Sequence, residues 1–418
     1  MRHLIILSFL LVAVLAGTNR SAAGNPVKAK VRVGADRLLK EEFNLVKGKR
    51  IALVTNHSAL CSDGTHIADA LKKRKDVALT ALFGPEHGIR GDAPDGKTIT
   101  DSVDARTGVK VFSLYGKISK PTPEMLRDVD VLVFDIQDVG VRFYTYISTL
   151  FLTMEAAAEQ HIPFVVLDRP NPIRGTWCDG PIRVDSLKTF VGWAPMPIAH
   201  GMTVGELARM ANGEGWLKDG VKADLHVVKM DGWKRSLWYD ELSLAWVRPS
   251  PNMRTLSTAT VYPGTCLIEG TNVSEGRGTD FPFETIGAPW INGDSLAAML
   301  NAEKLPGVTF ETIVFTPKEM PGVKSPKYNN EQCRGVFLRV TDRNAFQPVA
   351  AGIALVRDLY RMYPSQLVFR GRGFDRLAGT PRVREMITSG ATLGEIESSW
   401  KDELAKFDAQ RRTYFFYH

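Results

Sequence analysis

Glu86, His87 and Arg90 stand close together and supply a carboxylate, an imidazole and a guanidinium. Proteins use these groups for acid–base catalysis and for binding anions. The apolar run at residues 77–82 comes just before them and predicts a buried strand, and glycines and a proline shape the turn between. The three polar groups are therefore expected just beyond the carboxyl end of a strand. One such loop alone could be an ordinary solvated turn.

The same arrangement recurs along the chain. The apolar runs at 50–54, 109–115, 129–134 and 164–167 predict further strands, and helical patterns cover 67–74, 143–161 and 203–211. This alternation predicts a parallel sheet with helices on both faces, and such sheets bind ligands at the carboxyl ends of their strands. The polar residues after the other strands, and in one later loop, are Asn56, His57, Asp135, Asp138, Arg142, Asp168, Arg169, Asn171 and His200. Together with Glu86 they predict an active-site rim.

A second polar segment follows three tryptophans, Trp233, Trp238 and Trp246. Residues 269–280 are rich in glycine and charge and have no apolar periodicity. Long ordered loops of this composition are often lids or walls of sites, although a solvated surface loop is the alternative. The polar candidates from this region are Asn252, Glu269, Asn272, Glu275 and Arg277.

The length of 418 residues, 44% of them hydrophobic, suits two domains. Residues 1–23 have basic residues, an apolar run and small residues in the order of a secretory signal peptide. An uncleaved anchor is the rival interpretation. We predict a signal peptide at 1–23, an α/β domain at 24–287 and a smaller α+β domain at 288–418, with a helix at 394–408 and a strand at 414–417. Export to the periplasm or the medium follows, without stable membrane insertion after the signal is removed.

Several function classes are disfavoured. The four cysteines form no CxxC pair, so no zinc site is expected and the thiols should be mostly buried and free. A formal charge of +7 without a Lys/Arg stripe argues against a nucleic-acid partner. No GxGxxG turn follows the first predicted strand at residues 50–54, which argues against a dinucleotide cofactor.

Other catalytic motifs are missing or out of context. Residues 91–98 match the phosphate-loop pattern, but no strand leads into them and no helical pattern follows. The chain has neither a GxSxG elbow nor an HExxH pair. His57, His87, His200 and Asp135 have no spacing typical of a metal site. We therefore expect neither a cofactor nor a metal.

In order along the chain, segments 84–91, 134–146, 167–172, 200–203, 249–252 and 269–279 resemble the exo-β-N-acetylmuramidase (NamZ) family. The resemblance covers nearly the whole chain after residue 23. It implies a Rossmann-like domain with a smaller carboxyl-terminal domain and a site in a cleft between lobes. It also implies release of N-acetylmuramic acid from the non-reducing end of peptidoglycan fragments. Muramyl saccharides would then be the partners, and the oligomeric state stays open.

Glycosidic cleavage commonly needs two carboxyl groups. Glu86 is the expected acid, because a turn at a sheet edge can partly remove it from water and favour its protonated form. His87 could orient it. Alternatively, the 2-acetamido group of the substrate acts as the nucleophile. The candidates for the second carboxylate are Asp135, Asp138, Glu269 and Glu275, with Asp135 placed first because it closes a strand beside the expected switch point.

Recognition of the lactyl carboxylate of N-acetylmuramic acid calls for a cation, ideally a guanidinium. Arg90, Arg142 and Arg277 are the candidates, although each could instead pair with an Asp to hold a loop. The other predicted substrate-binding residues are Asn56, Asp138, Tyr144, Arg169, Asn171, His200, Asn252, Asn272 and Glu275. A two-lobe exported binding protein for sugars or muropeptides is the main alternative function. An amide or ester hydrolase with His57 or His200 as base is another.

Overall fold

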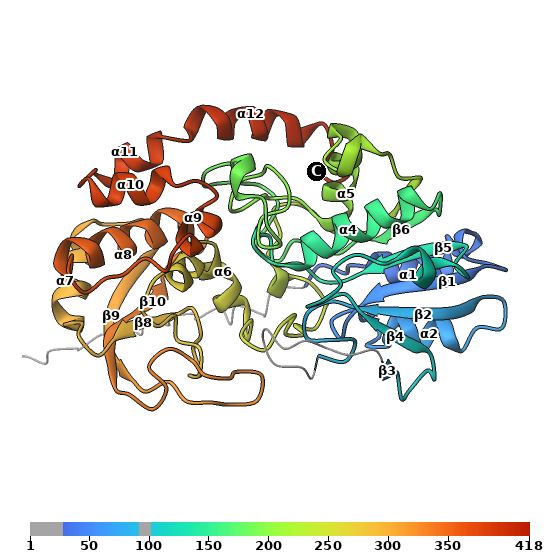
Figure 1. The fold of residues 1–418 in the computed structure, drawn as a ribbon, viewed down its shortest axis with the longest axis horizontal. Coiled ribbons are helices and arrows are strands. Elements are labelled where there is room, and N and C mark those ends of the chain that lie inside the picture. Colours follow the sequence, from blue (N-terminus) through green and yellow to red (C-terminus); the bar gives the residue numbers. More distant parts are fainter. Residues whose placement is uncertain (1–27, 92–101) are drawn as a thin grey trace, which may run out of the picture.

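The computed structural model describes residues 28–91 and 102–418. The predicted signal peptide and most of the phosphate-loop match lie outside these ranges. Figure 1 shows two lobes, with the earlier part of the chain in one lobe and most of the later part in the other. No helix in the described ranges is long and apolar enough to cross a membrane.

The larger sheet has the order β3-β4-β2-β1-β5-β6-β7 in the described chain. All its neighbours pair in parallel except β3, which runs antiparallel to β4. The chain moves outward from β1 to β2 and β4, then returns to β5 on the other side of β1, which creates the switch point typical of doubly wound sheets. The predicted parallel sheet is confirmed. Its strands are β1 (Arg50–Thr55), β2 (Ala78–Gly84), β3 (Ser102–Val103), β4 (Lys110–Ser113), β5 (Val131–Asp135), β6 (Phe164–Leu167) and β7 (Leu225–Val228).

Helices cover both faces of this sheet, as predicted. Strand side chains alternate between faces: Leu53 packs in a core with α1 (Gly34–Lys40) and α2 (Ile67–Lys72), whereas Val54 packs with α4 (Tyr146–Glu159) and α5 (Val204–Glu214). The remaining helical segments of this lobe are α3 (Pro123–Leu126) and the short 3₁₀ turns η1 (Phe43–Leu45), η2 (Asp185–Leu187), η3 (Lys218–Gly220) and η4 (Tyr239–Glu241).

The second lobe is built on an antiparallel sheet of order β8-β10-β9. Its strands are β8 (Thr285–Ala288), β9 (Val308–Phe315) and β10 (Cys333–Val340). Its helices are α6 (Leu256–Thr265), η5 (Cys266–Gly270), α7 (Gly293–Ala302), α8 (Pro348–Met362), α9 (Gly373–Ala378), α10 (Arg382–Thr388), α11 (Leu393–Ser398) and α12 (Lys401–Arg412). One apolar core runs through both lobes.

The second lobe takes in residues that lie before the predicted boundary at 288. Strand β8 pairs with β10, and α6 packs closely on α8. A Cβ atom on Gly352 of α8 would lie 2.3 Å from the Gly264 carbonyl oxygen, so only glycine permits this approach. These contacts join residues from about α6 onward to the second lobe.

The last part of the chain differs from its prediction. The expected single helix at 394–408 is broken into α11 and α12 at Trp400, whose buried indole donates to Asp179 (3.3 Å). Residues 414–417 form no strand; Tyr417 instead packs edge-on against Trp233. Both predictions were wrong because tertiary contacts override local pattern. Figure 1 shows α12 crossing back from the second lobe toward α5.

Candidate active site

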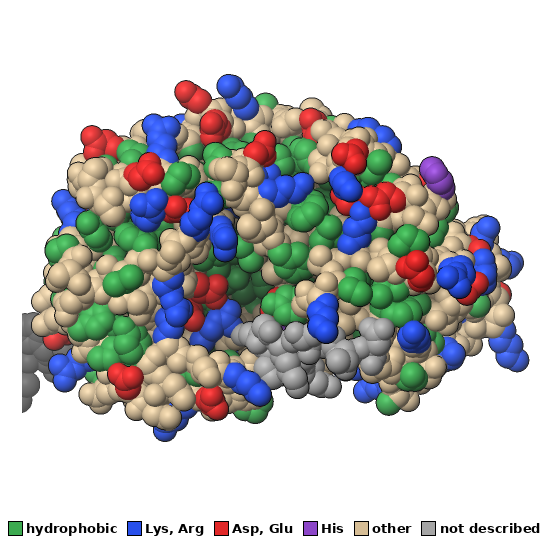
Figure 2. Space-filling model, in the orientation of Figure 1, with side chains coloured by type: hydrophobic (Ala, Val, Ile, Leu, Met, Phe, Trp, Pro, Cys, Tyr) green, Lys and Arg blue, Asp and Glu red, His purple; other side chains and the backbone are tan. Residues whose placement is uncertain are grey.

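A cavity of about 180 Å³ lies where the two lobes meet. The first lobe contributes the turn after β2 and the segment before α4, and the second contributes α6, η5 and the loop before β8. Figure 2 shows a hollow at this junction with acidic and basic side chains gathered at its edge. The lining residues that matter for chemistry are Glu86, His87, Tyr144, Thr145, Tyr146, Ser250, Asn252, Tyr262, Glu269, Arg277 and Phe283.

Glu86 reaches the cavity from a tight turn at the carboxyl end of β2. The Gly88 amide donates to the Pro85 carbonyl (3.0 Å), and His87 has φ +70°, a conformation that residues other than glycine rarely adopt. The Glu86 side chain is half-buried, and the Thr145 hydroxyl donates to its Oε2 (3.0 Å). The structure thus places Glu86 and His87 just beyond the carboxyl end of β2, and both line the cavity.

Glu269 and Arg277 bring opposite charges to the other side of the cavity. Arg277 donates through Nε and Nη2 to a single oxygen of Glu269 (3.1 and 2.7 Å). Its Nε also lies 3.4 Å from Glu275. Lys327 adds a second cation, 2.9 Å from Glu275, and donates to the Val273 carbonyl (2.8 Å). The loop at residues 269–280 is thus held in place by ion pairs of Arg277 within it and of Lys327 from outside it.

Aromatic rings form much of the cavity wall. Tyr144 packs edge-on against Tyr146 (4.9 Å between centroids), and Tyr262 packs edge-on against Phe283 (4.6 Å). Burial raises the pKa of Tyr144 and of Tyr262 well above its usual range, so both hydroxyls stay protonated donors. The wall therefore combines aromatic rings with charged and polar side chains.

Asp138 and His200 form a buried pair in the loops behind Tyr144. Asp138 Oδ2 accepts from the Gly140 amide (2.6 Å) and from His200 Nε2 (3.2 Å). His200 Nδ1 accepts from the Met202 amide (3.1 Å), which leaves the proton on Nε2. The two predicted residues are thus brought together, but neither lines the cavity itself.

Asp135 does not reach the cavity, although the sequence placed it first for the second carboxylate. It is fully buried and bonded through both oxygens to Arg169. Arg169 also donates to the Leu60 carbonyl (3.0 Å). The pair joins the carboxyl ends of β5 and β6, and neither residue lines the cavity. Its role is therefore to hold the loops that follow these strands.

Arg90 and Arg142 likewise lie outside the cavity lining. Arg90 pairs with Asp104 (2.8 Å) and Asp69 (2.8 Å); against the opposing effect of desolvation, the bonds from Arg90 and Thr107 lower the pKa of Asp104 to about 2. These charges line a larger hollow of about 840 Å³ at the edge of β2 and β4, where they neutralise one another.

Arg142 is fully buried and meets three carbonyl groups. It donates to Pro181 (2.9 Å), Met196 (2.7 Å) and Leu377 (2.7 Å), so it ties the first lobe to α9. Burial, and then the charge of Arg183, lower the pKa of Arg142 to about 9. Its contacts are those of a structural tie.

Three predicted asparagines anchor loops. Asn56 accepts from the Ser58 amide (3.0 Å), Asn171 accepts from the Ile173 amide (3.1 Å), and Asn272 accepts from the Val368 amide (2.9 Å). Asn252 differs from them because it lines the cavity.

Several cavity residues were missed from the sequence. Thr145 and Ser250 stand inside motifs that had been singled out, so their place in those motifs was a usable signal. Tyr262 and Phe283 come from the second lobe, and nothing in their local sequence separates them from core aromatics.

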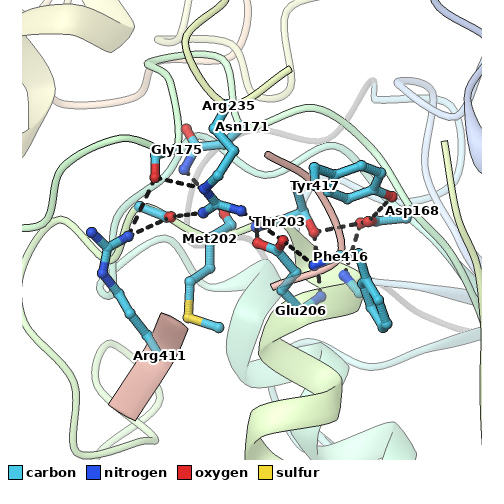
Figure 3. Close-up of polar contacts among 12 residues, drawn as sticks. Asp168, Asn171, Gly175, Met202, Thr203, Glu206, Arg235, Arg411, Phe416 and Tyr417 are labelled. Carbon is cyan, nitrogen blue, oxygen red and sulfur yellow. Dashed lines mark hydrogen bonds and ion pairs between the residues drawn. The ribbon is translucent and has the colours of Figure 1, made fainter. Parts of the chain in front are cut away.

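Asp168 follows β6 and belongs to a buried hydrogen-bond network that includes Phe416 and Tyr417 near the carboxyl end of the chain (Figure 3). Its carboxylate accepts from Tyr417 (2.6 Å), Thr203 (2.8 Å) and the Gly205 amide (2.8 Å). Burial raises the pKa of Asp168 to about 7, against the opposing effect of these bonds.

The same network holds the loop that carries His200. Glu206 accepts from Arg235 (2.6 Å) and from the Phe416 amide (2.9 Å). Arg235 and Arg411 both donate to the Gly201 carbonyl (2.5 and 2.8 Å), one residue beyond His200 (Figure 3). The end of α12 therefore helps to fix a loop that stands behind the cavity.

All four cysteines are free, as predicted, and three of them are buried. Within residues 28–91 and 102–418, no group of three His, Cys, Asp or Glu side chains is arranged to hold a metal ion.

Comparison with known proteins gives consistent matches over nearly the whole chain. Residues 51–257 match the model of the N-terminal part of exo-beta-N-acetylmuramidase NamZ, and residues 260–417 match that of the C-terminal part. A Bacillus subtilis (strain 168) protein named peptidoglycan beta-N-acetylmuramidase NamZ is 46% identical over 420 residues, covering 99% of each chain.

Two solved structures of DUF1343 family proteins from Bacteroides fragilis NCTC 9343 have the same fold. One is 36% identical with a TM-score of 0.85, and the other is 34% identical with a TM-score of 0.77. Each alignment covers 93% of this chain and 99% of the other. By these matches over both lobes, the chain belongs to the exo-β-N-acetylmuramidase NamZ family.

Proposed function

We propose that this protein is an exo-acting glycoside hydrolase that releases N-acetylmuramic acid from the non-reducing end of peptidoglycan fragments during cell-wall turnover. One observation carries the proposal: Glu86 from the first lobe and the Glu269–Arg277 pair from the second line the same cavity. The name of the Bacillus subtilis relative supports the same activity and substrate class.

The carboxylates favour hydrolysis over simple binding. A receptor for an anionic sugar would lose affinity by placing carboxylates in its pocket, because like charges repel. A glycoside hydrolase needs two such groups, one to protonate the leaving oxygen and one to act as nucleophile or base. Glu86 takes the first role. Glu269 replaces Asp135 as the first candidate for the second role, because Asp135 is bonded to Arg169 away from the cavity.

Arg277 is assigned to the lactyl carboxylate. Of the three predicted arginines, Arg277 alone lines the described cavity, whereas Arg90 and Arg142 are bonded elsewhere. A guanidinium can turn from Glu269 toward an incoming carboxylate without losing charge-assisted hydrogen bonding. Selectivity for muramic over glucosamine substrates then depends on this one side chain.

The test is hydrolysis of a chromogenic β-N-acetylmuramide by the purified protein beside Glu86→Gln. We expect release of the chromophore by the parent and loss of at least ~100-fold in the variant, within the usual range for removing a general acid. Thermal unfolding of both proteins checks that the variant is folded, and product masses must show free N-acetylmuramic acid. Full activity in Glu86→Gln would move the acid elsewhere. A parent that binds the sugar but never cleaves it would make the protein a receptor, and released peptide or acetate would make it an amide or ester hydrolase.

Export is the second part of the proposal and depends on residues 1–23, which lie outside the described residues. An intact-mass measurement on the protein recovered from the periplasm or the medium should show cleavage close to residue 23. Recovery in the cytoplasm with residues 1–23 still present would contradict it.

A further inference from the structure

Thr145 stands at the start of α4 and contacts the side chain of Glu86. Its hydroxyl donates to Glu86 Oε2 (3.0 Å), and both side chains line the cavity. The two residues are 59 positions apart and come from different elements, the turn after β2 and the N-terminus of α4. The fold therefore brings a neutral donor to the carboxyl group that the proposed function makes the acid.

The Thr145 hydroxyl is not used to begin the helix. Threonine is a common N-cap residue, because an extended backbone lets its side chain accept from the first amides of a helix. Thr145 occupies the N-cap position of α4, yet its backbone is already helical (φ −61°, ψ −18°) and its side chain makes no cap hydrogen bond. Helix capping therefore does not account for the hydroxyl at this position.

The surroundings of Glu86 Oε2 favour negative charge on this carboxyl group. Helix α4 is 14 residues long, and the N-terminal end of a helix carries a partial positive charge. A hydroxyl donor stabilises a carboxylate more than it stabilises a neutral carboxyl group, because hydrogen bonds to charged acceptors are stronger. Both effects therefore grow as Glu86 changes from the acid to the carboxylate.

We propose that Thr145 is the positioning residue of the acid: it orients the Glu86 carboxyl group and stabilises the carboxylate that forms when the proton leaves. The inference rests on the proposed muramidase function and deepens it. Because Thr145 donates to Oε2, the transferable proton sits on Oε1. It passes to the glycosidic oxygen as the bond from that oxygen to the sugar carbon breaks. The electron pair stays on the leaving oxygen, which departs as a hydroxyl group, and the carbon accepts an electron pair from the second carboxylate or a water.

Thr145→Val is the decisive variant, because valine has nearly the shape of threonine without the hydroxyl. On the disaccharide of N-acetylmuramic acid and N-acetylglucosamine, kcat/KM should fall roughly 10- to 100-fold, the effect of one hydrogen bond to a charged group. The loss should lie in kcat, because the bond strengthens only as charge develops. On a dinitrophenyl N-acetylmuramide, whose leaving group needs no proton, the loss should be much smaller. Thr145→Ser restores the hydroxyl and should recover most of the activity on the disaccharide.

Thr153→Val is the matched control, since it makes the same substitution on the same helix. Thr153 is buried, and its hydroxyl donates to the Thr149 and Leu150 carbonyls (2.8 and 3.0 Å) instead of a carboxylate. Its loss should lower the melting temperature and leave the ratio of kcat/KM between the two substrates unchanged. An equal loss on both substrates in Thr145→Val, or no recovery in Thr145→Ser, would overturn the inference in favour of a structural role.

Crystal structures of the variants separate this inference from the proposed function. A parent that releases N-acetylmuramic acid from neither substrate would sink the proposed function, and the place of the Glu86 carboxyl group would then decide the inference. That group should keep its place in Thr145→Ser and leave it in Thr145→Val, and an unmoved group in Thr145→Val would refute the positioning role. An active parent whose Thr145→Val variant loses equally on both substrates would sink only the inference.

Discussion

Replacing Arg277 by Met should reduce turnover of N-acetylmuramides far more than turnover of N-acetylglucosaminides. The guanidinium lines the cavity and its side chain is 24% exposed, so water screens it only in part. A charge-assisted hydrogen bond in such a setting contributes about 1.5–3 kcal/mol. This amount corresponds to roughly 10- to 150-fold in the ratio of kcat/KM between the two sugars.

The assay measures kcat/KM for matched chromogenic glycosides of the two sugars. Removing Arg277 also leaves Glu269 without its partner, and this effect should lower turnover of both substrates, so only the ratio reports on the lactyl group. Arg277→Lys keeps the charge without the fork and should give an intermediate ratio.

Arg90→Met is the control for this prediction. Arg90 pairs with Asp104 and Asp69 away from the cavity, so its loss should cost stability and leave the ratio unchanged. Equal losses on both sugars in Arg277→Met would refute the assignment. A shift of the ratio in Arg90→Met would refute the geometric argument that excluded Arg90.

Three further predictions concern stability and pH. Because burial raises the pKa of Asp168 from 3.8 to about 7, its contribution to the free energy of unfolding is complete below pH 4 and is lost as pH rises through 7. Between pH 5 and pH 8, urea unfolding should show Asp168→Asn losing less stability than the parent by up to about 3 kcal/mol, whereas equal losses would contradict it. Asp135→Asn breaks the buried pair with Arg169 and should cost about 3–5 kcal/mol, seen as a lower denaturation midpoint; a change under 1 kcal/mol would be inconsistent with that pair. Tyr417→Phe removes the bond to Asp168 and should cost about 1 kcal/mol in the same assay without changing the substrate preference, and an altered preference would disprove a purely structural role.

The sheet and the Glu86 turn could be predicted because their signals are local. Apolar runs set the strands, and the glycines and proline around Glu86 set the turn. The start of α4 shows where such reasoning fails: the pattern predicted a helix from residue 143, but the helix begins at Tyr146. Tyr144 and Thr145 are thereby left in the turn, where they line the cavity.

The partners of charged side chains could not be predicted, because they come from distant parts of the chain. Asp135 and Asp138 are of one residue type and three positions apart, yet Asp135 meets Arg169 and Asp138 meets His200. The sequence suggested that Arg142 could bind the lactyl carboxylate. In the structure its acceptors are carbonyl groups, one of them that of Leu377. These outcomes depend on tertiary packing, which no local pattern records.

The return of α12 to the first lobe has a consequence for folding. Tyr417 bonds to Asp168 across a sequence separation of 249 residues, and Phe416 bonds to Glu206 across 210. Contacts of such long range form late, since a large loop must close first. Because the chain is synthesised from its amino end, Asp168 and Glu206 can form these contacts only after almost the whole chain has been made. The two lobes, although each has its own sheet, should therefore unfold together in one cooperative step.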